Sequence, residues 1–277
     1  MKKIAWLGLI TGSLLFSSYT FAFDVKEMTI PGSDIPKALP ATVVLPDGYA
    51  DSNKRFPTLY LLHGWSGNNT EWVAKTDIGT LADEHQMIVV MPNGAYDSWY
   101  IDSPAKKDSK YQTYIGKDVV NYIDNKFKTI SKKGARAITG LSMGGYGSLN
   151  VALNNQSVFG NVGSMSGGVD PRYFPQNWGM ESVFGDHIKN KDYWDNKAII
   201  SNAHRFIFSG IDIIIDCGVD DFFSRSNREL HNLLVELKIP HDYIERPGKH
   251  NWDYWRNSIK FQTLFFSNKF DEKLNRK

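Results

Sequence analysis

Gly140, Ser142 and Gly144 form a G-x-S-x-G pattern, in which a serine hydroxyl could act as a nucleophile. The pattern follows the apolar run 135–139 and precedes the small residues 145–149, which predicts a strand, a sharp turn and a helix. Such a turn exposes the serine above a sheet, and its close backbone contacts require glycine on either side. We therefore predict that Ser142 is a catalytic nucleophile; the alternative is a glycine-rich packing turn.

A serine hydroxyl needs a general base and a group that orients the base. Five histidines follow Ser142. His187 and His204 lie in the aperiodic segment 169–206, His231 lies in a predicted helix, and His241 stands at the start of a predicted strand. His250 lies in the loop 247–251 between the last predicted strand and the last predicted helix, where the histidine of an α/β-hydrolase belongs. We predict His250 as the base.

The orienting acid should follow a strand that ends near the histidine. The apolar run 211–215 leads into Asp216, which still belongs to the strand, and then into a glycine turn with Asp220 and Asp221. Spacing alone does not choose between the two turn carboxylates. Cys217, beside this turn, is expected to be a small buried hydrophobe.

Two backbone N–H groups are expected to stabilise the oxyanion of a tetrahedral intermediate. One belongs to Met143, directly after the serine. The other should lie in the loop 61–67 after an early predicted strand, where we assign it to Trp65. His63 precedes Ser142 in the chain and is expected to support this loop.

These residues require a scaffold in which strands alternate with helices. Apolar runs predict strands at 42–45, 58–62, 87–91, 135–139, 162–165 and 211–215, and more weakly at 243–244. Helical spacing predicts helices at 70–83, 115–127, 143–153, 226–237 and 252–265. The alternation indicates an α/β fold with a mainly parallel central sheet and helices on both faces. We also expect an edge hairpin from 25–30 and 42–45, and an irregular excursion at 169–206 over one end of the sheet.

Four motifs occur in order along the chain: HGWSG at 63–67, GLSMGG at 140–145, DCGVDDF at 216–222 and GKHNWDYW at 248–255. Together they resemble the esterase D family of α/β-hydrolases, which includes S-formylglutathione hydrolases, tributyrin-type and feruloyl esterases, and mycobacterial mycolyltransferases. The resemblance spans roughly residues 42–266.

The resemblance implies an α/β-hydrolase domain with Ser142 as nucleophile and His250 as base. It places the acid at Asp221 and the oxyanion donors at Trp65 and Met143. The loop 93–100 also resembles a family loop near the acyl pocket.

Aromatic residues crowd the same segments as these candidates. Most are expected to pack in the core or to anchor loops. Trp65 and Trp99 are the two that we predict as pocket walls.

The first 22 residues have the features of a cleaved secretory signal. Lys2 and Lys3 precede a twelve-residue apolar run, and Thr20-Phe21-Ala22 fits a signal peptidase site. The run is too short for a bilayer core of about 30 Å, which argues against a membrane anchor. Cleavage would leave one domain, 23–277, with 30 basic and 30 acidic residues, in a periplasmic or secreted protein.

Composition removes several classes of partner and cofactor. A precursor charge of +2 lacks the basic excess of a nucleic-acid-binding protein, and the single cysteine excludes a cysteine-rich zinc site. We therefore expect no nucleic acid, no metal and no cofactor, and a small-molecule or carbohydrate ester as substrate. The oligomeric state is left open.

The resulting hypothesis is an exported serine carboxylesterase that acts through an acyl-enzyme on small acyl or aryl esters. Three alternatives stay open: an acyltransferase on the same residues, a thioesterase of the S-formylglutathione type, and a non-catalytic carbohydrate-binding module. The signal sequence is unlike the cytosolic formylglutathione branch of the family.

Overall fold

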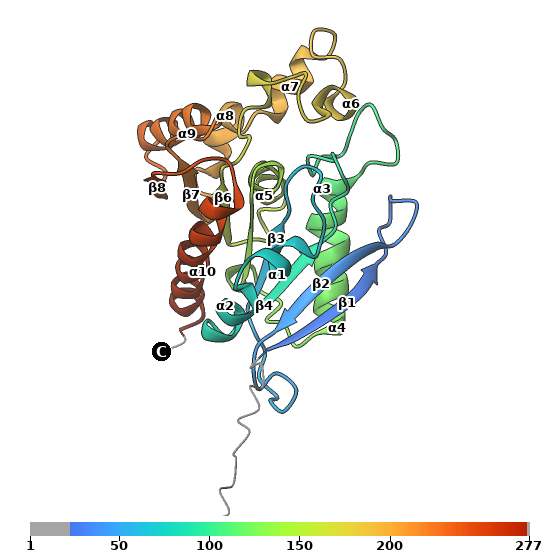
Figure 1. Ribbon diagram of the computed structural model, residues 1–277, viewed down its shortest axis with the longest axis vertical. Helices are drawn as coiled ribbons and strands as arrows, with labels where there is room; N and C mark the ends of the chain where they lie inside the picture. The colour runs from blue at the N-terminus through green and yellow to red at the C-terminus, as the bar shows by residue number, and fades with distance from the viewer. Residues whose placement is uncertain (1–22, 276–277) are drawn as a thin grey trace, which may run out of the picture.

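The computed structural model describes residues 23–275; the predicted signal sequence lies outside them. Eight strands form one sheet in the order β1-β2-β4-β3-β5-β6-β7-β8 (Figure 1). The strands are β1 (Asp24–Ile30), β2 (Leu39–Leu45), β3 (Thr58–Leu62), β4 (Ile88–Pro92), β5 (Arg136–Gly140), β6 (Asn161–Met165), β7 (Asp212–Gly218) and β8 (Asp242–Arg246).

The strand directions confirm the predicted sheet. From β4 to β8 every neighbouring pair is parallel, whereas β1 and β2 form an antiparallel hairpin and β2 runs antiparallel to β4. Every residue of β3, β4, β5 and β6 is buried, as parallel strands covered on both faces require. The sheet is that of an α/β-hydrolase.

The helices are α1 (Glu71–Lys75), α2 (Ile78–Glu84), α3 (Tyr111–Thr113), α4 (Val120–Lys126), α5 (Met143–Asn154), α6 (Met180–Phe184), α7 (Lys191–Lys197), α8 (Ile199–Asn202), α9 (Ser224–Glu236) and α10 (Trp252–Leu274). A π-helical stretch, Tyr114–Val119, joins α3 to α4. The helix predicted at 70–83 is two helices, because the chain is extended at Thr76 (φ −143°, ψ 170°). The last helix continues to Leu274 because Phe270 stays fully buried on the core.

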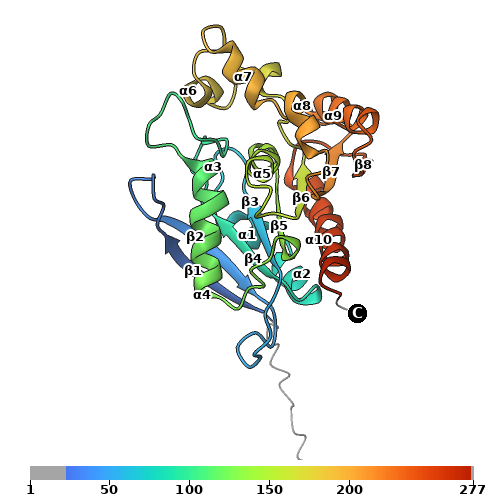
Figure 2. The same ribbon diagram turned by 180° about the vertical axis from the view of Figure 1, so that it is seen from behind.

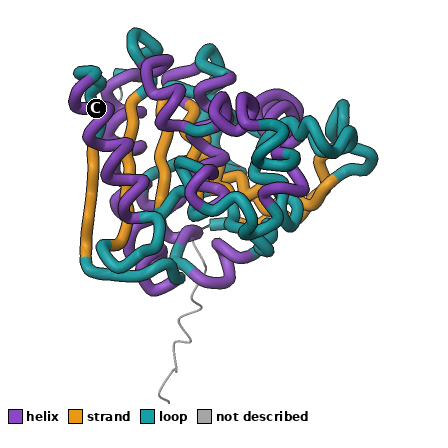
Figure 3. Tube along the Cα trace, turned by 90° about the horizontal axis from the view of Figure 1, so that it is seen from above, coloured by secondary structure: helices purple, strands orange, loops and turns teal. Residues whose placement is uncertain are grey.

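Alternate residues of each strand face two separate cores, as the pleat of a strand requires. Tyr60 and Leu62 face a core shared with α4, α5 and α9, whereas Leu59 and Leu61 face a core shared with α1, α2 and α10. Figure 2 shows α4 in front of the strands when the molecule is seen from behind, and Figure 3 shows helices alongside the strands, with one strand at the outer edge.

The segment 169–206 contains short helices, α6, α7 and α8, beyond one end of the sheet (Figures 1 and 2). Met180, Phe184 and Trp194 of this segment are fully buried and belong to the same core as α4, α5 and α9. Trp178 from this segment lines the same pocket as Ser142, so the segment lies over the carboxyl end of the sheet. Within residues 23–275, no helix has the length and apolar composition to cross a bilayer.

Candidate active site

Ser142 lies between the end of β5 and the start of α5 in a strained backbone conformation, with φ 55° and ψ −115°. A Cβ atom on Gly140 would lie 2.6 Å from the carbonyl oxygen of Leu62, and one on Gly144 would lie 2.6 Å from that of His63. Neither position accepts a side chain because β3 passes too close. The two glycines of the motif therefore let the turn raise the serine above the sheet.

The structure brings Ser142, His250 and Asp221 into one hydrogen-bonded chain. His250 Nε2 lies 2.9 Å from Ser142 Oγ, and His250 Nδ1 lies 2.8 Å from Asp221 Oδ2. Because a carboxylate only accepts, Nδ1–H donates to Asp221 and leaves Nε2 to accept the serine proton. The Asp221 side chain is fully buried and the His250 side chain is 15% exposed. The hydrogen bond between Asp221 and His250 is therefore shielded from water, whereas His250 can be reached from the pocket.

Burial and direction separate the three aspartates at the end of β7. Asp221 is 3% exposed, and its second carboxylate oxygen accepts a hydrogen bond from the Phe223 N–H at 2.8 Å. Asp220 is exposed, and its backbone N–H donates to the Gly248 carbonyl. Asp216 lies inside the sheet and hydrogen-bonds Arg246 and Tyr254 instead of histidine.

The other histidines have different partners. His63 donates from Nδ1 to the Gly64 carbonyl and accepts the Gly94 N–H at Nε2, so it fastens its loop to the loop at 94. Burial lowers the pKa of His63, which favours the neutral form that these two bonds need. His231 lies on α9 and His241 directly precedes β8, and their ring nitrogens hydrogen-bond each other at 2.8 Å.

The loop 64–67 lies against the serine. A Cβ on Gly64 would be 3.6 Å from the Ser142 Cβ, and the Ser66 N–H donates to the Tyr96 carbonyl, which joins this loop to the loop that contains Tyr96. Met143 is the first residue of α5, so its N–H has no acceptor within the helix. Gly64, which precedes Trp65, and Met143, which follows Ser142, therefore both lie next to the serine.

A pocket opens directly onto the serine. Its walls are Gly64, Trp65, Ser66, Glu71, Lys75, Leu141, Ser142, Trp178, His250, Trp252 and Trp255. The pocket therefore combines four indoles with one Lys–Glu ion pair, in which Lys75 Nζ lies 2.6 Å from Glu71 Oε1. Trp65, one of the two predicted wall residues, is among them.

Trp99, the other predicted wall residue, is not in this wall. It is 1% exposed, and its Nε1–H donates to the Trp178 carbonyl at 3.1 Å. Trp178 lines the pocket instead. Its position is fixed by this hydrogen bond and by the left-handed backbone of Trp178 (φ 49°) and Gly179 (φ 70°). Sequence reasoning missed Trp178 because it lies in the aperiodic segment 169–206.

Aromatic rings also surround the histidine. The Phe222 ring lies 4.2 Å from the His250 ring, and Trp178 stacks on Phe222 at 5.3 Å and 17°. Phe222 is 47% exposed, so its ring borders solvent beside the histidine.

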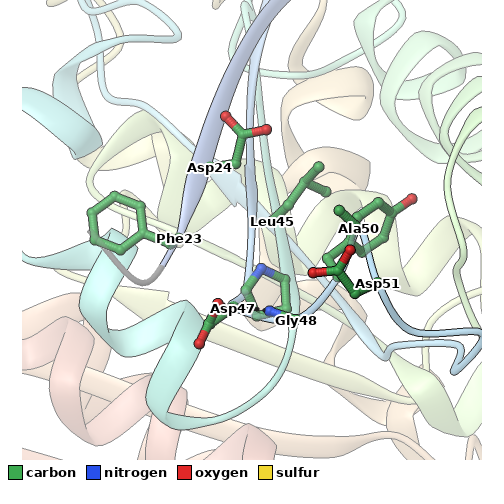
Figure 4. Close-up of a pocket in the computed structure, with 9 residues that line it drawn as sticks. Phe23, Asp24, Leu45, Asp47, Gly48, Ala50 and Asp51 are labelled. Atoms are coloured by element: carbon green, nitrogen blue, oxygen red, sulfur yellow. Dashed lines mark hydrogen bonds between the residues drawn. The ribbon is translucent and has the colours of Figure 1, made fainter. Parts of the chain in front are cut away.

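Figure 4 shows a different hollow, at the start of β1 and the end of β2, lined in part by Asp24, Asp47 and Asp51. Val44 pairs with Val89 in the first half of β4, so this hollow lies at the amino end of the parallel strands, opposite Ser142. Among residues 23–275, no serine or histidine lines it. The buried Cys217 is also inert, since burial raises the pKa of its thiol.

An α/β sheet with a serine on a strained turn, in hydrogen-bond contact with a histidine, defines a serine hydrolase of the α/β-hydrolase fold. The family model described as "Putative esterase" matches residues 33–266. The chain belongs to this esterase family, which confirms the resemblance seen in the motifs, and it is an ester-hydrolysing serine hydrolase.

Individual proteins agree with this assignment. The chain is 29% identical to an acetyl esterase of Caldicellulosiruptor saccharolyticus over 75% of this chain and 82% of that protein. Its fold is similar to that of FphF, a fluorophosphonate-binding serine hydrolase of Staphylococcus aureus, with a TM-score of 0.79, 25% identity, and 88% and 98% of the two chains covered. A ferulic acid esterase structure gives a TM-score of 0.78 at 24% identity, covering 90% and 100%.

Proposed function

We propose that this protein is an exported carboxylesterase in which Ser142, His250 and Asp221 form the catalytic triad. The observation that carries the proposal is the continuous hydrogen-bonded chain from Asp221 through His250 to Ser142, with contacts of 2.8 and 2.9 Å. These distances are within the range for proton transfer between a nucleophile and its base.

The reaction proceeds in two halves. Ser142 Oγ attacks the ester carbonyl carbon while His250 Nε2 takes the serine proton, and the N–H groups of Trp65 and Met143 stabilise the oxyanion. The bond to the alcohol then breaks, and His250 returns the proton to the departing alcohol. A water molecule then attacks the acyl carbonyl carbon while His250 Nε2 takes its proton. The bond between that carbon and Ser142 Oγ breaks, His250 returns the proton to Ser142 Oγ, and the acid leaves. Asp221 orients the imidazole and stabilises its charged form throughout.

The substrate class that we favour is an ester with a small acyl or aryl group. Indole faces favour flat or apolar groups, and Trp65, Trp178, Trp252 and Trp255 all line the pocket. An acetyl esterase is among the relatives, and a ferulic acid esterase is among the structures with this fold.

An ester panel tests this function. Acetyl through octanoyl p-nitrophenyl esters, methyl ferulate, an acetylated sugar and S-formylglutathione should be compared by kcat/KM, with alcohol acceptors added in a parallel series. We expect oxygen esters to be hydrolysed best and free acid to remain the main product. Preference for S-formylglutathione would instead assign a thioesterase. A predominant transfer product with the alcohol acceptor would assign an acyltransferase.

We also propose export, with cleavage after Ala22. The support is the signal-like sequence of residues 1–22. Expression of the full chain in a Gram-negative host, followed by intact-mass measurement of the periplasmic fraction and medium, should give a protein that begins at Phe23. A protein that stays in the cytoplasm with residues 1–22 attached would contradict the proposal.

A further inference from the structure

A buried polar cluster joins the three elements around the loop that carries His250. Asp216 comes from β7, Arg246 is the last residue of β8, and Tyr254 lies in the first turn of α10. The Tyr254 hydroxyl donates to one oxygen of the Asp216 carboxylate, and Arg246 Nη2 donates to the other. Arg246 Nη2 also donates to the Ser258 hydroxyl at 3.0 Å.

Burying these polar and charged side chains costs desolvation free energy, so the cluster should have a role that offsets this cost. Asp216 is fully buried and Tyr254 is 5% exposed. Burial raises the pKa of the Asp216 carboxyl, although the Tyr254 hydroxyl and the Arg246 charge act in the opposite direction. Replacing such a buried ion pair by apolar residues often leaves folding stability unchanged or raises it. Folding stability alone therefore does not explain why these residues are present.

The two ends of the histidine loop are fixed to one carboxylate. The loop runs from Pro247 to Asn251, between Arg246 and the start of α10, and both Arg246 and Tyr254 bind Asp216. The Tyr254 ring also packs on the middle of the loop, because a Cβ on Gly248 would lie 2.3 Å from a ring carbon. Gly248 has φ 153°, so this close approach depends on glycine in a conformation that other residues rarely adopt.

The same loop is bonded to the turn that carries Asp221. The Val219 N–H donates to the Arg246 carbonyl at 2.9 Å, and the Asp220 N–H donates to the Gly248 carbonyl at 3.0 Å. Asp216 and Asp221 lie on one continuous segment, the end of β7 and its turn. The cluster therefore ties the histidine loop to the segment that holds its partner carboxylate.

We propose that Tyr254 is a positioning residue for His250, acting through its hydroxyl on Asp216 to hold the histidine loop in line with Asp221 and Ser142. The proposal rests on the triad assigned above. Tyr254 itself touches neither His250 nor Ser142 by hydrogen bond, so its effect passes through the loop.

Tyr254→Phe tests this role because it removes one hydroxyl and keeps the ring against Gly248. The matched control is Tyr243→Phe, which removes a hydroxyl that donates to Glu245 at 2.9 Å on the same strand as Arg246. For each variant, kcat and KM should be measured per active site titrated with a fluorophosphonate, so that unfolded protein does not count. We expect Tyr254→Phe to lose on the order of tenfold to a hundredfold in kcat, the scale of a misplaced catalytic group, with KM within about twofold of wild type.

The outcomes are distinct. A loss in kcat per titrated site in Tyr254→Phe, with Tyr243→Phe close to wild type, supports the positioning role. A wild-type kcat in Tyr254→Phe, or an equal loss in Tyr243→Phe, overturns it. Failure of the triad itself would show separately, as a wild-type protein that neither hydrolyses esters nor takes up the fluorophosphonate.

Discussion

Replacement of Ser142 by alanine is expected to lower kcat for ester hydrolysis on the order of 10⁶-fold, by analogy with loss of the nucleophile in a serine protease. Alanine keeps the Cβ and lacks the Oγ that forms the acyl-enzyme. The variant should keep the melting temperature of the wild type within a few degrees, since only one hydroxyl is lost at the pocket surface. The measurement is kcat with p-nitrophenyl acetate after subtraction of the uncatalysed rate.

The matched control for this variant is Ser66→Ala. Ser66 lines the same pocket and also has a positive φ, 61° against 55° for Ser142, so a general effect of serine loss or backbone strain should appear in both. We expect the control to retain turnover. Comparable activity in Ser142→Ala and wild type would remove the assignment of the nucleophile.

The second large effect is expected at Asp221. Asp221→Asn should lower kcat on the order of 10⁴-fold, as the same change does in the serine-protease triad, because an amide no longer holds the histidine in the tautomer that accepts the serine proton. The neighbouring Asp220→Asn is the natural control, since Asp220 is exposed and contributes a backbone bond that asparagine keeps.

The comparison of these two variants decides the acid directly. Both should be assayed with the same ester and titrated for active sites. If Asp220→Asn alone abolished turnover while Asp221→Asn retained it, the acid would be Asp220 and the hydrogen bond to His250 would have another role.

Much of the scaffold was predictable because parallel strands buried on both faces leave a simple pattern. The apolar runs at 58–62, 135–139 and 162–165 correspond to β3, β5 and β6 within a residue. The weak candidate at 243–244 is part of the edge strand β8, whose residues are only partly buried, so its apolar pattern is diluted. The break between α1 and α2 falls at Thr76, where no glycine or proline in the sequence marks the end of a helix.

Site residues that belong to a sequence motif could be predicted. Site residues whose roles depend on tertiary contacts were harder to predict. Gly140 and Gly144 identify Ser142 because only glycine fits so close to β3. Asp220 and Asp221 are alike in sequence; the resemblance to esterases favoured Asp221, and burial separates the two. Trp99 and Trp178 could not be ranked, because their roles follow from a hydrogen bond between residues 79 positions apart.

The most direct test of the triad is the site of covalent labelling by a fluorophosphonate. Intact-mass measurement and peptide mapping of the treated wild-type protein should show one phosphonyl group, on the peptide that contains Ser142, and no label after Ser142→Ala. His250→Ala should slow the labelling strongly, because the serine then lacks its base. A label on any other residue, or equal labelling of wild type and Ser142→Ala, would contradict the account.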